Sequence, residues 1–373
     1  MRILQIVTKR QFRGAEVFAS ILASDLAGRG HQVLFLGLYS PPPEPLTASG
    51  TSNFDLLVAP GSPLQAVYRL YRFVRDHRPD VIQCNGSDTL KYTCLALKLI
   101  RHAPPIVYRN ISMISHWVNT PAKKWVYRWL FGSVKMVVSV SDASRADFVN
   151  LIKKRNADVV TIKNVITIKR GVDLPTGFDR TQARKDLNEA FPVLQGQFVL
   201  LHVGAMTGEK NHPGLLRVLK EIVAHVAGVF LVCLGDGPGR AALDELVAHL
   251  GLHENVLFAG YQTDPSRFYL AADLLLLPSR IEGIPGVVLE AAAFQTPTVA
   301  YRVGGMEEAI VQRETGVIVE DDDECAMAAE AVRLLRNEAA RLRMGKAARE
   351  YVEKHYNRDV TVDQFEKLYR SLV

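Results

Sequence analysis

Two glutamates and the short turn between them have the residue types and the spacing to bind a polar ligand. Glu282 opens the stretch "EGIPG", and Glu290 lies eight positions later inside the alanine-rich run "VVLEAAA". The glycines in residues 283–286 let backbone N–H groups come close to a ligand. A helix that begins near Val287 would point its positive end at the same place. The turn therefore suits a phosphate group or sugar hydroxyls.

Both carboxylates can face one ligand, because Glu282 stands in the turn and Glu290 about one turn into the predicted helix. The alternative interpretation is that both acids are solvated or cap the helix. A candidate cation, Lys210, lies in a separate stretch, "HVGAMTGEKNH". It could stabilise a leaving diphosphate, since such a transfer is carried largely by electrostatic stabilisation. Its alternative is an ordinary surface lysine.

The elements that must position these residues are buried parallel strands. The turn follows the apolar run "LLLLPS", and Lys210 follows "FVLLHVGAM". Short apolar runs alternate with helical patterns in both halves of the chain, and this alternation predicts parallel β-α-β units. Ligands of such sheets bind outside the carboxyl ends of the strands. We therefore expect the chemistry in the loops that follow the strands.

The chain has 373 residues, which is too long for one ordinary hydrophobic core, so two domains are expected. The alternation of strands and helices restarts after a join at residues 169–182. We predict an α/β fold with two doubly wound, Rossmann-like domains, residues 1–172 and 173–356. The amphipathic C-terminal helix, about residues 357–373, is expected to pack back on the first domain.

Composition indicates a soluble globular enzyme, since 48% of the residues are hydrophobic and 23% are charged. The sequence has no run of about 18 apolar residues that could span a membrane. The apolar run at the N-terminus is too short for a signal peptide. The four cysteines show no CxxC spacing, so free thiols in a reducing cytosol are expected.

Charge is divided unevenly between the two halves of the chain. Residues 1–175 carry 24 Lys and Arg against 11 Asp and Glu, a net of +13, whereas residues 176–373 carry 21 against 28, a net of −7. The basic half should favour an anionic partner: a membrane surface, a phosphorylated glycan or nucleic acid. No RNP, helix-turn-helix or zinc signature supports nucleic acid, so we expect no nucleic-acid partner.

Two basic stretches of the first half, residues 64–78 and 122–135, place Arg and Lys among aromatic side chains at helical spacing. This composition is typical of a helix that lies on an anionic lipid surface. The alternative is a pair of ordinary surface helices whose aromatic residues, including Trp125 and Trp129, belong to the core together with Leu130.

Seven motifs, in order, resemble those of the retaining GT-B glycosyltransferases of the large family-four group. The signature is E-x7-E, formed by "EGIPGVVLE" and followed by "VGG". The other motifs are "GAE" with "GRGHQV", "VSVSDASR", "VGAMTGEKNH", "LGDGPGR", "VLFAGYQTD" and "AADLLLLPS". The resemblance covers most of the chain. It implies two domains that face each other across a cleft, with a UDP- or GDP-sugar on the second domain and the acceptor on the first.

By this resemblance, Glu282 contacts the transferred sugar, Lys210 meets the diphosphate, and Glu290 accepts hydrogen bonds from the ribose hydroxyls. The catalytic residues expected are Glu282 and Lys210, with Arg109 and His116 as further candidates. The residues expected to bind the donor are Gly14, Gly204, Lys210, Gly235, Tyr261, Arg280, Glu282, Gly283, Ile284, Pro285, Gly286, Val287 and Glu290. Gly14 and Tyr261 have plain alternatives, a turn glycine and a core aromatic residue.

The chain departs from the family pattern at two positions. The family usually has an arginine directly after the glycine that ends the first strand of the second domain, where this chain has Ala205. Arg280, beside Glu282, is the candidate replacement. The family also shows a histidine after the strand "PIVYRN", where this chain has Arg109 and its neighbours, and the nearest histidine is His116.

Two further motifs suggest other chemistry on first inspection. The stretch "GDGPGR" at 235–240 has the glycines of a dinucleotide fingerprint but no acid at the right spacing, so we interpret it as a strand-to-helix turn near the nucleotide. The stretch "DDDE" at 321–324 could hold a metal ion. Because it precedes a helical run, we interpret it as a helix start.

The sequence thus predicts a retaining glycosyltransferase that needs no metal or other cofactor. Its partners would be a nucleotide-sugar donor, a glycan or lipid-linked acceptor of envelope polysaccharide or lipopolysaccharide synthesis, and an anionic membrane surface. We expect it in the cytoplasm, peripherally at the inner face of the membrane. The rival prediction is a non-catalytic GT-B-like protein that recognises a glycan or an anionic surface.

Overall fold

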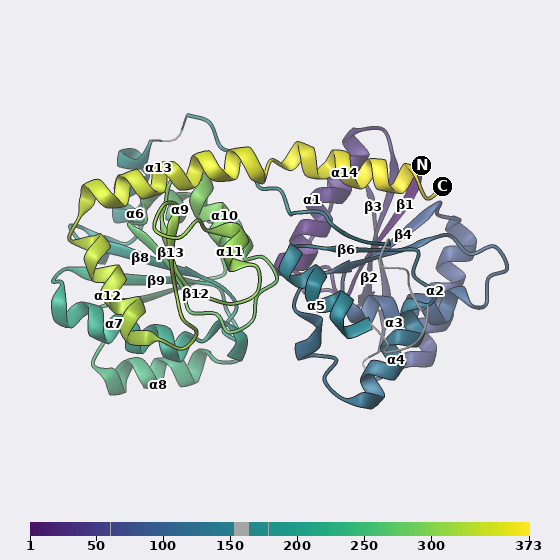
Figure 1. Ribbon diagram of the computed structural model, residues 1–373, viewed down its shortest axis with the longest axis horizontal. Coiled ribbons are helices and arrows are strands. Elements are labelled where there is room, and N and C mark those ends of the chain that lie inside the picture. Colours follow the sequence, from purple (N-terminus) through teal and green to yellow (C-terminus); the bar gives the residue numbers. More distant parts are fainter. Residues whose placement is uncertain (60, 153–163, 178) are drawn as a thin grey trace. The chain divides into compact units, whose positions relative to one another are not determined.

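The computed structural model describes residues 1–59, 61–152, 164–177 and 179–373, which form two compact units (Figure 1). Unit 1 is Met1–Arg170 together with Asp359–Val373, and unit 2 is Gly171–Arg358. The boundaries placed from the sequence, 172 and 356, each differ from these by two residues. Each unit has a parallel sheet with helices around it, so the predicted pair of Rossmann-like α/β domains is confirmed.

Unit 1 is built on a parallel sheet of strand order β3-β2-β1-β4-β5-β6-β7. Its strands are β1 (Arg2–Val7), β2 (Gln32–Tyr39), β3 (Ser52–Val58), β4 (Val81–Cys84), β5 (Ile106–Asn110), β6 (Met136–Ser139) and β7 (Val165–Thr167). Its helices are α1 (Gly14–Gly28), α2 (Pro63–His77), α3 (Ser87–Leu97), α4 (Pro121–Phe131), α5 (Asp142–Ile152) and α14 (Arg358–Arg370). Successive residues of the central strands enter different hydrophobic clusters, as Ile3 and Leu4 do. Burial on both faces explains why these strands are continuous apolar runs.

The C-terminal helix α14 packs on the first sheet and on α1. Phe365 lies with its ring centroid 6.0 Å from that of Phe18, and the Tyr369 hydroxyl donates to Gln83 Oε1 at 2.5 Å. The Tyr369 hydroxyl also accepts from Gln5 Nε2 at 3.0 Å. This helix therefore closes one face of unit 1, although more than 170 residues separate it from the rest of that unit.

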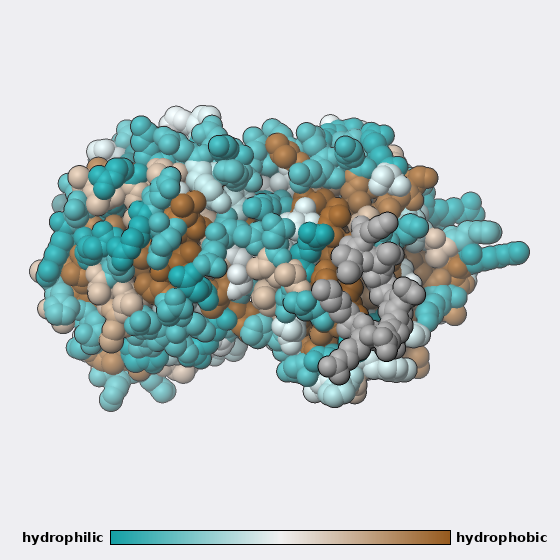
Figure 2. Space-filling model, in the orientation of Figure 1, coloured by the Kyte–Doolittle hydropathy of each residue, from teal (hydrophilic) through white to brown (hydrophobic). Residues whose placement is uncertain are grey.

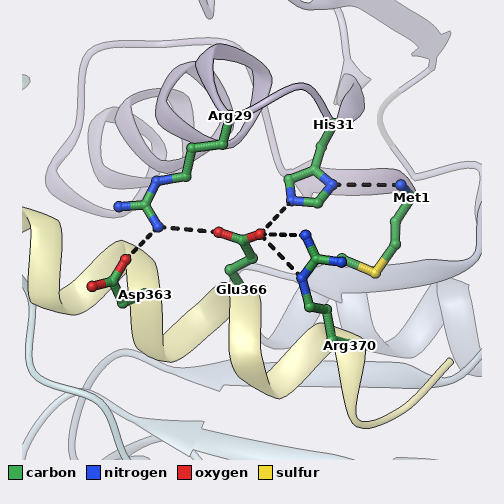
Figure 3. A network of polar contacts seen from close by, with 6 residues as sticks. All are labelled: Met1, Arg29, His31, Asp363, Glu366 and Arg370. Carbon is green, nitrogen blue, oxygen red and sulfur yellow. Dashed lines mark hydrogen bonds and ion pairs between the residues drawn. The ribbon is translucent and has the colours of Figure 1, made fainter.

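A polar network also holds α14 to unit 1, and Glu366 is its centre (Figure 3). Its carboxylate accepts from Arg29 Nη1 and His31 Nε2, both at 3.1 Å, and from Arg370 Nη2 at 2.7 Å. Hydrogen bonds from Arg370, Arg29 and His31 lower the pKa of Glu366 to about 2. The carboxylate therefore stays charged throughout the physiological range.

Unit 2 is built on a parallel sheet of order β10-β9-β8-β11-β12-β13. Its strands are β8 (Phe198–Val203), β9 (Val229–Leu234), β10 (Val256–Gly260), β11 (Leu274–Leu277), β12 (Thr298–Tyr301) and β13 (Gly316–Val319). Its helices are α6 (Arg180–Ala190), α7 (His212–His225), α8 (Arg240–Leu250), α9 (Ser266–Ala271), α10 (Gly286–Ala293), α11 (Met306–Ala309), α12 (Glu324–Leu335) and α13 (Glu338–His355).

A buried carboxylate ties β8 to β11 at the amino ends of the two strands. Asp273 accepts from the backbone N–H of Val199 at 2.8 Å. It also pairs with Arg180 at 3.1 Å, Arg184 at 2.6 Å and Arg341 at 3.5 Å. Because Asp273 is only 4% exposed, these partners stabilise a charge that burial would otherwise disfavour. The network fixes the two strands whose other ends carry the candidate site.

Two observations concern the surface and the helices of the two units. Hydrophilic residues cover most of the face in Figure 2. Among the described residues, no helix has both the length and the apolar character that crossing a bilayer requires.

The four cysteines are free thiols, and only Cys325 is exposed. The interpretation of "DDDE" as a helix start is confirmed, because Asp323 caps α12 by accepting from Ala326 N at 2.9 Å.

Candidate active site

The candidate residues of unit 2 meet where its sheet reverses chain order, between β8 and β11. Strands β9 and β10 lie beyond β8, and β12 and β13 lie beyond β11. The loops that leave two such neighbouring strands turn away in opposite directions and open a crevice at their carboxyl ends. Lys210 stands in the loop after β8, at the end of the short 3-10 helix η4 (Gly208–Lys210), and Glu282 stands in the loop after β11.

Lys210 and Glu282 form an ion pair that joins these two loops. Lys210 Nζ lies 2.7 Å from Glu282 Oε1, and the side chains are 22% and 10% exposed. The two loops are also joined through backbone, since the N–H of Arg280 donates to the carbonyl of Glu209 at 2.9 Å. An ammonium group has three donors and a carboxylate two acceptor oxygens. The pair can therefore bind a ligand and keep its mutual contact.

Glycines allow the neighbouring loops to close tightly around the pair. Gly304, which follows β12, has φ of +54°, and a Cβ there would lie 1.9 Å from the carbonyl oxygen of Glu282. Gly235, which follows β9, has φ of +126°, and its Cβ would lie 2.2 Å from the carbonyl oxygen of Gly204. A Cβ on Gly204 would touch the Lys210 side chain at 3.3 Å. Only glycine fits the first two positions.

Helix α10 begins at Gly286, one residue before the predicted start, directly after the turn that Glu282 opens. Its first N–H groups have no carbonyl one turn earlier to bond, so they can donate to an anion. Glu290 lies in the second turn of α10, where its Oε2 accepts from the Tyr269 hydroxyl at 2.9 Å. The structure thus places Glu282, residues 283–287 and Glu290 along one loop and one helix.

Two histidines that the sequence did not single out are buried beside Lys210. His202, in β8, and His212, the first residue of α7, have ring centroids 4.6 Å apart. His202 Nδ1 bonds the Leu276 carbonyl at 2.9 Å, whereas neither ring nitrogen of His212 has a hydrogen-bond partner among the described residues. Burial, followed by the charge of Lys210, lowers the pKa of His212 to about 4. Burial lowers the pKa of His202 as well, so both rings are neutral at neutral pH.

Three other predicted residues of unit 2 lie at the edge of this arrangement. The Arg280 side chain pairs with Asp322, with Nη2 3.1 Å from Oδ1, and both side chains are about half exposed. Tyr261 follows β10 and is 46% exposed, which rules out the alternative that it is a core aromatic residue. Ala205 is half-buried in the loop between β8 and Lys210. A role for Arg280 in place of an arginine at 205 remains a prediction.

The predicted residues of unit 1 lie on three different elements. Gly14 is the first residue of α1, and a Cβ there would meet nothing within 4 Å. Arg109 lies in β5 and is 4% exposed, with its guanidinium carbon 3.7 Å from the centroid of the Phe18 ring. Burial, then the charge of Arg170, lowers the pKa of Arg109 to about 9. His116, in contrast, is exposed at the end of the 3-10 helix η1 (Ile114–His116).

Sequence reasoning missed the residues that depend on long-range packing. His202 and His212 belong to different elements, and Asp273 is recognisable only from its arginine partners. A signal for Gly304 was available in "VGG", which the E-x7-E signature includes. Among the described residues, no group of three or more His, Cys, Asp or Glu is arranged to hold a metal ion.

Comparison with known proteins gives one family match in each half of the chain. Residues 184–351 match the family described as "Glycosyl transferases group 1", and residues 12–170 match "Glycosyltransferase Family 4". The chain is 29% identical over 242 residues to the N-acetyl-alpha-D-glucosaminyl L-malate synthase of Bacillus anthracis, which covers 64% of this chain and 62% of that protein. It is 28% identical over 206 residues to the lipopolysaccharide core biosynthesis glycosyltransferase LpsD of Rhizobium meliloti (strain 1021), covering 54% and 58%. The matches thus span about 60% of the length of these relatives.

The fold is shared over its whole length with a solved structure. The crystal structure of Anabaena HepE in complex with UDP and glucose has a TM-score of 0.84 and 19% sequence identity, and the match covers 99% of each chain. At this identity the likeness concerns the fold.

Proposed function

The chain belongs to the glycosyl transferases group 1, with a GT-B fold, and from this premise we propose that it transfers a sugar from a UDP- or GDP-sugar to a glycan or lipid-linked acceptor. The observation that carries the proposal is the Lys210–Glu282 pair at the point where the sheet of unit 2 reverses chain order. Complexes of HepE with UDP and with UDP-glucose support a nucleotide-sugar as the donor.

In the proposed reaction, the donor diphosphate lies between Lys210 and the first turn of α10. The lysine ammonium and the N–H groups of residues 286–287 stabilise the negative charge that develops on the leaving group. One N–H donor of Lys210 already bonds Glu282, and the remaining N–H donors suit phosphate oxygens. No metal is required, because these groups supply the positive charge.

The two carboxylates bind the neutral parts of the donor. Glu282 uses its second oxygen for a hydroxyl of the transferred sugar, and Glu290 accepts from the ribose hydroxyls. The hydrogen bond from Tyr269 holds the Glu290 carboxylate toward one side of α10. In this proposal both acids act as hydrogen-bond acceptors, one from the turn and the other from the apolar helix α10.

The stereochemical course that we propose is retention by front-face substitution. The bond from the anomeric carbon to the diphosphate breaks as the acceptor oxygen forms its bond on the same face. The leaving phosphate takes the acceptor proton. Arg109 is unsuited to that proton transfer, since a guanidinium stays protonated at neutral pH even with its pKa lowered to about 9.

Relatives support the acceptor class. LpsD is named for lipopolysaccharide core biosynthesis, and a second relative, CapM of Staphylococcus aureus, for capsular polysaccharide biosynthesis. We propose a similar envelope glycan as the acceptor and the cytoplasm, at the inner face of the membrane, as the place of reaction.

Nucleotide release from a panel of UDP- and GDP-sugars, with and without lipid-linked glycan acceptors, tests the proposal. We expect acceptor-dependent release from one donor of the panel. The rival function, a non-catalytic GT-B-like protein that binds a glycan or an anionic surface, has Ala205 and the missing histidine in its favour. Tight binding of a nucleotide-sugar, with no release of free nucleotide under any condition of the panel, would support that rival.

A further inference from the structure

The three tryptophans of the chain, Trp117, Trp125 and Trp129, are all exposed to solvent. Their exposed fractions are 53%, 71% and 46%. Tryptophan is among the side chains that folding usually buries most extensively on average. The alternative that Trp125 and Trp129 are core residues is therefore wrong, and of the three residues it named only Leu130 is buried.

Helix α4 has separate buried and exposed faces. Tyr127, Leu130 and Phe131 enter the hydrophobic core of unit 1. Trp125 and Trp129 are four residues apart, so they lie one above the other on the other side of the helix. That solvent side would ordinarily be polar in a surface helix. On α4, large apolar side chains lie on the solvent-exposed side as well as on the buried side.

Two lysines contact two of these tryptophans. Lys98, at the end of α3, places its Nζ 3.3 Å from the centroid of the Trp129 ring. Lys123 Nζ donates to the carbonyl of Trp117 at 3.2 Å. Helices α3 and α4 lie side by side in unit 1 (Figure 1), and Cys94 Sγ contacts the Leu130 carbonyl at 3.5 Å. We give the name tryptophan face to the exposed residues before and on the solvent side of α4 and at the end of α3: Lys98, Leu99, Trp117, Lys123, Trp125 and Trp129.

The segment that builds the tryptophan face has an unusual charge. Residues 89–141 contain eight Lys or Arg and not one Asp or Glu. The other basic stretch forms α2, which exposes Leu64 and Tyr68 but has no tryptophan. Two of its cations have partners within the protein: Arg75 pairs with Asp76 at 2.9 Å, and Arg69 donates to the Leu57 carbonyl at 2.7 Å. The absence of acids in residues 89–141 and the exposed tryptophans together single out α3 and α4.

We propose that the tryptophan face docks on an anionic bilayer surface. Indole rings are favoured at the boundary between headgroups and acyl chains, because they join a large apolar body to an N–H donor. Lysines around them would meet lipid phosphates, and no carboxylate of residues 89–141 opposes that contact. The docking concerns unit 1 alone and is independent of the transferase proposal.

One cation of α4 is unsuitable for a test of this proposal. Arg128 is half-buried, and its Nη2 donates to the Leu151 carbonyl at 3.1 Å. Replacing it would disturb packing as well as charge. Lys98, Lys123 and Lys124 lie at or next to the tryptophan face, so the test variant replaces these three with Gln. The control replaces Lys185, Lys220 and Lys346 of unit 2, which are exposed and remove the same charge.

The test is binding of the full chain to vesicles of phosphatidylglycerol and phosphatidylcholine, or of phosphatidylcholine alone. Because every tryptophan lies on the tryptophan face, intrinsic fluorescence reports docking directly. We expect a blue shift and cosedimentation with the anionic vesicles only, both weakened by salt. The Lys98/Lys123/Lys124 variant should bind about a hundredfold more weakly, since each lysine near such a surface contributes about fivefold. The unit 2 control should bind like the wild type.

Three results would overturn the inference. The first is equal affinity of the two triple variants. The second is a blue shift that is the same with neutral and anionic vesicles. The third is a blue shift that follows protein concentration without lipid, together with a dimer in sedimentation velocity, which would make this surface a protein–protein interface. A Trp125→Ser variant, which keeps two reporters, should dock more weakly while keeping its free energy of unfolding.

Discussion

Replacing Gly304 with alanine should move the Glu282 turn and thereby reduce turnover. The alanine Cβ would lie 1.9 Å from the Glu282 carbonyl oxygen. Cβ contacts shorter than 3.0 Å are essentially never seen, so the two groups must separate by about 1.1 Å. Gly305 N also bonds the Gly283 carbonyl at 2.8 Å, which couples the same turn to residue 304. A displacement of about 1 Å at a catalytic group can lower the rate about a hundredfold.

The matched control is Gly251→Ala at the end of α8. Gly251 has φ of +69°, close to the +54° of Gly304, and a Cβ there meets nothing within 4 Å. Both variants should lose about 1 kcal/mol of unfolding free energy from the left-handed backbone. Only Gly304→Ala should also distort the site.

The assay is nucleotide release at saturating donor, together with urea denaturation of each variant. We expect Gly251→Ala to keep wild-type turnover and Gly304→Ala to lose about a hundredfold. If the two variants had the same turnover, the contact between residue 304 and the Glu282 turn would be irrelevant to catalysis, and the reasoning would be refuted.

Three other predictions follow from the structure. The pKa of His212 is about 4 against an ordinary value of about 6.5, so between these pH values the unfolded chain binds more protons than the folded chain. The contribution of His212 to the free energy of unfolding is therefore complete above pH 6.5 and falls by about 3 kcal/mol toward pH 4. Urea denaturation at pH 5 and pH 7 should show this slope, and His212→Gln should make it shallower while the share of His202, whose pKa burial also lowers, remains; an equally steep slope in the variant would contradict the assignment. Asp273→Asn should lower the free energy of unfolding by about 3–5 kcal/mol, because it leaves three arginines without their buried partner, and a loss below 1 kcal/mol would argue against the network. Transfer should persist in EDTA, because Lys210 and Tyr269 already engage the two carboxylates of the site, and strict dependence on Mn²⁺ or Mg²⁺ would contradict this.

The sequence was most informative where a strand is buried on both faces. Runs such as "FVLLHV" and "LLLL" became β8 and β11, since central parallel strands contact helices on each side. Strand β3, "SNFDLLV", was not anticipated, because it lies at the edge of its sheet and is only partly buried, which gives it a mixed pattern. Strand β7 is three residues long, too short for a periodic signal.

The same distinction applies to the candidate site: local patterns identified single residues, but not the contacts between them. Glu282 and Lys210 were chosen separately because each follows an apolar strand, and parallel strands bring their carboxyl ends to one edge. Their 2.7 Å contact joins residues 72 positions apart, which no local pattern encodes. The neutral pair of His202 and His212 was invisible for the same reason, since its pKa shifts arise from burial in the folded chain.

The most direct test of the central claim is the turnover of Glu282→Gln and Lys210→Ala beside their unfolding free energies, with Lys220→Ala on the exposed side of α7 as the control. In the proposed reaction Glu282 faces the reacting sugar and Lys210 the leaving diphosphate, so each site variant removes a charge from the centre of that reaction. We predict a loss of about 10²–10³ in turnover for both, with unfolding free energies that change far less, and wild-type behaviour for the control. Near-wild-type turnover in both site variants would contradict the assignment of the Lys210–Glu282 pair as the centre of a glycosyltransferase.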